Sequence, residues 1–165
     1  MTRVKPFSAP AMHPHEALVR RFYAAFAARD AEGMAACYHP DVFFSDPVFP
    51  RLRGAEAADM WRMLLGRARE LEVTLEEASG DADGAVARWT ARYRFRGRPV
   101  VNRVRSMFAF RDGRIVRHYD HFSLWRWAAQ GFGPWGAALG WFGPFRWAVR
   151  SRSRRALERF SAARA

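Results

Sequence analysis

The chain has 165 residues, half of them hydrophobic, and a formal net charge of +12. This length and apolar content suit one globular domain with a sizeable core and exclude a chain that stays disordered. The one cysteine, Cys37, cannot form an internal disulfide, and the first residues contain no apolar stretch typical of a secretory signal. We therefore expect a cytoplasmic protein.

The N-terminal half of the sequence predicts helices. Residues 1–14 are proline-rich and aperiodic, which predicts a mobile arm. A first helix is expected over residues 15–29, because Leu18, Phe22 and Phe26 repeat at helical spacing, and a second is expected over 31–38, where a proline at position 40 ends it. A strand follows at 42–46, and a third helix is predicted over 55–69.

Four strands are predicted after these helices. They cover residues 72–78, 85–95, 100–110 and 114–124, and they are separated by glycine-containing turns, of which Asp112-Gly113 is the tightest. Helices followed by a run of antiparallel strands define an α+β fold.

The last of these strands contains the strongest site candidates. Successive side chains of a strand point to opposite faces, so Val116, His118 and Asp120 share one face, whereas Ile115 belongs to the other. That first face is apolar except for the histidine and the aspartate. A carboxylate among apolar neighbours loses solvation, which raises its pKa and suits it to proton transfer.

The same alternation places further polar groups beside this strand. The preceding strand directs Asn102, Ser106 and Phe108 to one face, and the strand at 42–46 ends in a second acid, Asp46. We predict one apolar pocket with Asp120, Asp46 and His118 as catalytic candidates. The ligand-binding candidates are Phe22, Tyr23, Phe26, Trp61, Asn102, Ser106 and Phe108.

No sequence motif supports a metal site or a cofactor site. His121 is predicted to face away from His118 and Asp120, which leaves two candidate ligands where a metal site needs three or four. There is no glycine-rich phosphate loop and no nucleophile elbow. We therefore expect neither a metal nor a cofactor.

The stretches RRFYAAFAARDAEGMAACYHPDVFFSDP and FAFRDGRIVRHYDHF resemble the SnoaL-like, ketosteroid-isomerase-like branch of the nuclear-transport-factor-2-like superfamily. The resemblance covers about residues 17–124. It implies a cone-shaped, mostly antiparallel curved sheet wrapped around three N-terminal helices, a conical pocket for a hydrophobic small molecule, and often a homodimer.

The resemblance also implies roles for individual residues. Asp46 matches the position of the isomerase general base, while Phe22 and Ser106 stand where the isomerase has its oxyanion-hole tyrosine and protonated aspartate. Asp120 matches an essential aspartate of the limonene-epoxide-hydrolase branch and lies near the catalytic aspartate of SnoaL-like cyclases. That hydrolase pairs an arginine with an acid on a neighbouring strand, where this chain has Arg88-Trp89-Thr90.

Each acid also has a structural interpretation. Asp46 precedes a proline and would cap a turn, and Asp120 would be a partner for His118 or for an arginine. The sequence thus leaves open an enzyme that isomerises, cyclises or hydrolyses an apolar, for example cyclic, substrate, and a non-catalytic binder of such a molecule.

The C-terminal extension, residues 125–165, goes beyond the resemblance. Residues 127–145 carry no charge but include five glycines and two prolines, which argue against a membrane span. An arginine-rich helix is predicted from about 144 to 162, and residues 146–165 carry half of the net charge. We expect this extension to dock on the domain, residues 15–124, or on a partner subunit. A membrane surface is the second choice of partner and nucleic acid the third.

Overall fold

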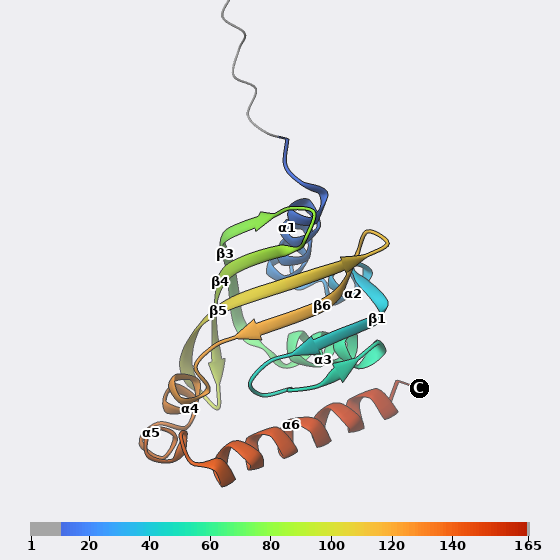
Figure 1. Ribbon diagram of the computed structural model, residues 1–165. Helices are drawn as coiled ribbons and strands as arrows, with labels where there is room; N and C mark the ends of the chain where they lie inside the picture. The colour runs from blue at the N-terminus through green and yellow to red at the C-terminus, as the bar shows by residue number, and fades with distance from the viewer. Residues whose placement is uncertain (1–10, 165) are drawn as a thin grey trace, which may run out of the picture.

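A computed structural model describes residues 11–164, so residues 1–10 of the predicted arm lie outside the described part (Figure 1). The domain begins with α1 (Pro14–Ala27), α2 (Ala31–Ala36), β1 (Tyr38–Ser45), β2 (Leu52–Arg53) and α3 (Ala55–Arg67). Four long strands follow, namely β3 (Arg69–Gly80), β4 (Ala85–Phe95), β5 (Arg98–Arg111) and β6 (Arg114–His121). The chain continues into α4 (Leu124–Phe132), α5 (Pro134–Leu139) and α6 (Gly143–Ala162).

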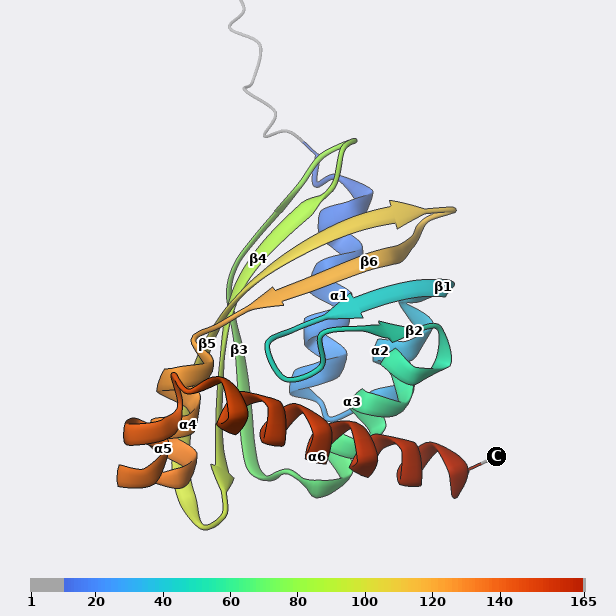
Figure 2. The same cartoon turned by 60° about the horizontal axis from the view of Figure 1, so that its bottom comes forward.

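The six strands form one curved, open sheet in the order β2-β1-β6-β5-β4-β3. Neighbouring strands are antiparallel except β1 and β6, which run parallel. The sheet curves around α1, α2 and α3, as Figure 2 shows. The predicted α+β class and the curved, mostly antiparallel sheet are thereby confirmed.

The first two helices begin where the sequence provides a capping side chain, and α1 also has an apolar face. The His13 side chain accepts a hydrogen bond from the backbone of His15, and the Asp30 side chain caps α2 at Gly33. In α1 the helical spacing brings Leu18, Val19, Phe22, Tyr23 and Phe26 to the buried side. These side chains fill the concave face of the sheet.

Tyr38 belongs to a strand, and its prediction as the end of the second helix is wrong. Helix α2 ends at Ala36, and β1 begins two residues later with Tyr38 paired to Ile115 of β6. Pro40 explains the difference, because it has no N–H for a helix and also favours an extended residue before it. The chain therefore turns from helix to strand before the proline is reached.

Ile115 is fully buried, and its prediction on the outer face is also wrong. The pairing of β5 with β6 shifts register between Ala109 and Phe110, so that the alternation changes near the start of β6. Such a bulge inserts an extra residue on one strand and reverses which side chains face inward. From His118 onward the predicted alternation agrees with the observed burial, with His118 and Asp120 inside and Arg117 outside.

The C-terminal extension packs on the domain. The Trp127 side chain in α4 donates a hydrogen bond to the Tyr93 hydroxyl of β4 over 2.8 Å. Helix α5 packs so closely on α4 that a Cβ at Gly136 would lie 1.9 Å from the carbonyl oxygen of Ala128. Only glycine fits at that contact.

Helix α6 runs along α3 and the β1–β2 edge (Figures 1 and 2). Its Leu157 side chain is 1% exposed, Arg154 pairs with Glu56, and Ser161 donates to Asp59 over 2.7 Å. The expected docking of the extension on the domain is therefore observed. No helix within residues 11–164 is both long enough and apolar enough to cross a bilayer.

Candidate functional site

A connected set of polar side chains lies inside the cone, between the sheet and the helices. His118 and Asp120 come from β6, Ser106 from β5, and Tyr23 from α1. All four are at most 4% exposed. Three more members of this buried network, which complete it through hydrogen bonds, are Tyr38, Trp61 and Trp89.

One arm of the network reaches Asp120 through Ser106. The Ser106 hydroxyl donates to Asp120 Oδ1, and Ser106 Oγ accepts from Trp89 Nε1 over 2.8 Å. Tyr23 OH lies 2.7 Å from the same Oγ. Since the serine hydrogen points to Asp120, the Tyr23 hydroxyl is the donor of that third bond.

The other arm reaches Asp120 through His118. The Trp61 indole donates to Tyr38 OH over 2.7 Å, and Tyr38 OH lies 2.8 Å from His118 Nδ1. His118 Nε2 lies 2.9 Å from Asp120 Oδ1. A neutral imidazole with its proton on Nε2 satisfies all of these contacts, because Tyr38 then donates to Nδ1 and His118 donates to Asp120.

Both arms therefore direct their hydrogens to one oxygen, Asp120 Oδ1. The second oxygen, Oδ2, receives no hydrogen bond from any residue in the range 11–164. Burial raises the pKa of Tyr23 and of Tyr38 well above the usual value, and the negative charge of Asp120 contributes in the same direction. The two tyrosines thus remain neutral donors, as this arrangement requires.

Aromatic rings surround the imidazole of His118. Phe108 lies 4.4 Å away and Phe44 5.0 Å away between ring centroids, and Phe22 follows at 5.4 Å. Phe26 packs one layer further out, against Trp61 at 5.0 Å. The low polarity of these walls strengthens every hydrogen bond inside them.

Asp46 lies just beyond the end of β1. Its Oδ1 accepts hydrogen bonds from the backbone of Val48 and Phe49, which agrees with the structural interpretation as a turn cap. Burial raises the pKa of Asp46 to about 7, with the backbone bond from Phe49 opposing this shift and the charge of Asp120 adding to it. Asp46 and Asp120 are therefore close enough to influence each other's charge, and each keeps its Oδ1 occupied.

The structure brings most of the predicted site residues together. The buried network includes the predicted residues His118, Asp120, Ser106, Tyr23 and Trp61. It is lined by the aromatic candidates Phe22, Phe26 and Phe108. Asn102 is half-buried on β5 opposite Ala91, and no hydrogen bond joins it to the network among the described residues.

Two members of the network escaped the sequence interpretation. Tyr38 was predicted to lie in a helix. Trp89 was considered only as part of Arg88-Trp89-Thr90, which lacks the acid of the hydrolase's arginine–acid pair. The alternation of β4 was the available signal for Trp89, since Ala85, Ala87 and Ala91 share its buried face.

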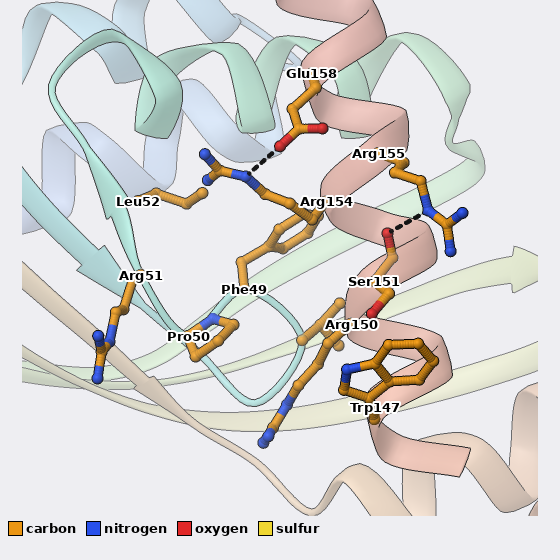
Figure 3. Close-up of a pocket in the computed structure, with 11 residues that line it drawn as sticks. Phe49, Pro50, Arg51, Leu52, Trp147, Arg150, Ser151, Arg154, Arg155 and Glu158 are labelled. Carbon is orange, nitrogen blue, oxygen red and sulfur yellow. Dashed lines mark hydrogen bonds and ion pairs between the residues drawn. The ribbon is translucent and has the colours of Figure 1, made fainter. Parts of the chain in front are cut away.

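Two hollows on the protein surface lie away from this network. One of about 750 Å³ lies between the loop at 48–52 and α6, where Figure 3 shows Trp147, Arg150 and Arg155. Another of about 360 Å³ includes Leu18 and Arg21. Neither is lined by Asp120, His118 or Asp46, so a pocket shared by these three residues stays a prediction. No cluster of three or more metal-binding side chains exists within residues 11–164.

Comparison with known proteins agrees with this fold. The sequence model of the SnoaL-like domain matches residues 19–118, and the chain therefore belongs to the SnoaL-like domain family. No curated protein sequence matches it.

Three solved structures illustrate the likeness. An LEH-like epoxide hydrolase from M. tuberculosis superposes with a TM-score of 0.64 at 22% identity, covering 79% of this chain and 98% of that chain. A protein of ketosteroid isomerase-like fold from Catenulispora acidiphila, in complex with trimethylamine, gives 0.62 at 17% identity, covering 77% and 96%. A candidate polyketide cyclase from Xanthomonas campestris pv. campestris gives 0.59 at 23% identity, covering 71% and 96%. At these identities the likeness concerns the fold alone.

Proposed function

We propose that this protein is an acid–base enzyme that acts on an apolar, for example cyclic, small molecule. The observation that carries the proposal is the arrangement at Asp120, where two arms of hydrogen bonds end on Oδ1 and leave Oδ2 without a donor. A carboxylate held in this way is oriented by the protein but keeps one oxygen for a substrate proton. Isomerisation, cyclisation and hydrolysis all need such a group.

Asp46 supplies the complementary partner. A carboxyl group with a pKa of about 7 is partly protonated at neutral pH, and its Oδ2 is not used by the turn. In this mechanism Asp120 Oδ2 accepts a proton from a substrate carbon or from an attacking water molecule. Asp46 Oδ2 donates a proton to a substrate oxygen, so that the charges of the two carboxyl groups exchange during the reaction.

His118 acts in this mechanism as a positioning residue. It touches Asp120 through Nε2 and Tyr38 through Nδ1, and it is completely buried. Its contribution is to fix the carboxylate plane of Asp120, as the second partner of a catalytic acid commonly does. Tyr23, Ser106 and Trp89 do the same from the other side.

Non-catalytic binding of the same kind of molecule is the second candidate. It is favoured by one observation, that every hydroxyl, indole and imidazole group of the buried network already has a hydrogen-bond partner inside the network. A network that is complete without a substrate has no need of one for stability.

Turnover separates the two candidates. The full-length protein is incubated with a panel of cyclic epoxides and cyclic ketones, and products are followed by mass spectrometry beside the Asp120→Asn variant. The proposal expects product from at least one class with the natural sequence only. Ligand binding by nuclear magnetic resonance without any product would overturn the enzyme and leave the binder.

A homodimer through the outer face of the sheet is also proposed. Val86 and Met107 face each other across β4 and β5 there and are 51% and 47% exposed. Tyr119 lies beside Met107 on β6, and arginine stems surround this apolar centre. A dimeric mass by light scattering at micromolar concentration is expected, and Met107→Glu should reduce it to the monomer mass.

A further inference from the structure

One long segment of the chain contains no acidic residue. From His121 to Leu157 the sequence has six arginines and not one aspartate or glutamate. This segment includes α4, α5 and most of α6. The charges on a surface built from it are therefore all positive, and its arginines attract polyanions.

Large aromatic side chains project from the middle of this segment. Trp135 in α5 is 75% exposed, Trp141 before α6 is 71% exposed, and Trp147 in the first turns of α6 is 68% exposed. Phe142 beside them is 46% exposed. Soluble proteins rarely leave several large apolar side chains together in water without a use for them.

Helix α6 adds a row of positive charges next to these rings. Arg152, Arg155 and Arg159 are exposed, and none of them pairs with a carboxylate among residues 11–164. By helical spacing they lie on the side opposite the buried Leu157, which faces the domain. In contrast, Arg154 on the flank of the helix is occupied by Glu56 and Glu158.

Helices α5 and α6 lie at the same end of the molecule, as both ribbon views show (Figures 1 and 2). The rings lie on α5 and at the start of α6, and the outward arginines follow further along α6, which runs from α5 along the base of the molecule. We call this the tryptophan–arginine surface and define it as Trp135, Trp141, Phe142, Trp147, Arg152, Arg155 and Arg159.

We infer that the tryptophan–arginine surface binds the face of an anionic lipid bilayer. Tryptophan prefers the boundary between headgroups and acyl chains, because its ring is apolar and its N–H is polar. Arginine gains from the negative potential of anionic headgroups. A chain segment with both residue types and no acid matches the two requirements of a peripheral membrane contact.

The burial of α6 determines how it would lie on the bilayer. Its apolar side chains Leu157 and Phe160 already pack on the domain, so Trp147 at the start of α6 is the large apolar side chain that this helix has left to insert. The rest of the helix thus contacts headgroups through its arginines, while α5 and the α5–α6 turn supply the other inserted rings. A single-stranded nucleic acid would also offer phosphates to the arginines and bases to stack on the rings, and it is therefore the competing occupant in the test.

Vesicle sedimentation with the full-length protein tests the inference. The probes are vesicles of phosphatidylcholine alone and vesicles with about one third phosphatidylserine. We expect the protein to pellet with the anionic vesicles only, with a blue shift of tryptophan fluorescence. Binding should fall at least about fivefold when salt rises from roughly 0.05 to roughly 0.5 M, because the arginine contribution is screened.

Two variants and a matched control locate the contact. R152Q/R155Q/R159Q and W135S/W141S/W147S should each lower the bound fraction at least about fivefold. R21Q/R103Q/R114Q removes the same charge from exposed sites outside the extension and should stay within about twofold of the natural protein. Circular dichroism checks that each variant folds.

Three results would overturn the inference. These are failure of the natural protein to pellet with anionic vesicles, binding by both variants that equals that of the natural protein, and competition of a single-stranded oligonucleotide for the same surface at lower concentration than lipid. The last result would assign the surface to nucleic acid. None of these results depends on whether the Asp120 site turns over a substrate.

Discussion

The tryptophans of this protein fall into two groups that use the same side chain in opposite ways. Inside the cone, Trp61 and Trp89 are nearly inaccessible and donate their indole N–H groups to Tyr38 and Ser106. In the extension, Trp135 and Trp141 expose most of their surface. Burial of an indole is favourable only where its N–H finds an acceptor, and the cone provides one for each ring. The extension keeps its rings outside instead, next to positive charge.

Aromatic content alone therefore does not locate the functional site. The interior rings shape a fixed polar network, whereas the exterior rings remain available to a partner. Variants that disturb one region should leave the other unchanged.

The largest effect is expected from Asp120→Asn. The amide oxygen still accepts from Ser106 and His118, so the fold should persist, but the group no longer transfers a proton. Turnover of any substrate found should fall by roughly a hundredfold or more while ligand affinity changes little. The exposed Asp112→Asn serves as the control and should keep full turnover. Equal turnover by both variants would remove Asp120 from the mechanism.

Ser106→Ala should cause the largest loss of stability. It removes the hydroxyl that serves Tyr23, Trp89 and Asp120 together, so that the Tyr23 hydroxyl and the Trp89 indole lose their partner and Asp120 keeps only His118. We expect the free energy of unfolding to fall by about 3 kcal/mol in urea denaturation. Ser79→Ala, at an exposed position of β3, should change it by less than about 0.5 kcal/mol. A small effect at Ser106 would mean that water replaces the hydroxyl.

Leu157→Ala tests whether the extension is part of the folded unit. Leu157 of α6 is 1% exposed, so its truncation should cost about 2 kcal/mol and appear in a single cooperative transition. Leu139→Ala, at a 39% exposed position of α5, is the matched control with a much smaller expected cost. Two separate transitions would show that α6 unfolds independently of the cone.

Asp46→Asn should change the pH dependence of stability. The folded pKa of about 7 is raised above the usual value of 3.8, so the contribution of Asp46 is fully present below pH 3.8 and is lost as pH rises through 7. Asparagine does not titrate and still accepts the bonds of the turn. The variant should therefore be more stable than the natural protein by on the order of 1 kcal/mol at pH 8, with the difference vanishing near pH 4. A constant difference across this range would contradict the raised pKa.

The fold was largely predictable because its signals are local and repeated. Alternation in β5 and in β6 from His118 onward placed Ser106, His118 and Asp120 inside, and helical spacing placed Phe22 and Phe26 against them. These three periodicities converge on the same interior, which is why most candidate residues meet there.

The remaining features depend on contacts between distant parts of the chain. The burial of Ile115 results from a shift of pairing between β5 and β6, and periodicity within one strand contains no information about its neighbour. Tyr38 joins the site because β1 pairs in parallel with β6, and this pairing joins residues that are far apart in the sequence. Likewise, the sequence of the uncharged residues 127–145 does not indicate whether their aromatic rings face the domain or the solvent.

Arg150 connects the two regions in a way that has an energetic consequence. Its Nε donates to the carbonyl of Pro47 over 2.9 Å, immediately after Asp46, and its charge lowers the pKa of Asp46. Any event that moves α6 away from this loop would raise that pKa further. Thermodynamic linkage is reciprocal, so protonation of Asp46 would loosen the hold on α6 by the same free energy. The docking of α6 and the proton affinity of Asp46 are thereby linked through Arg150.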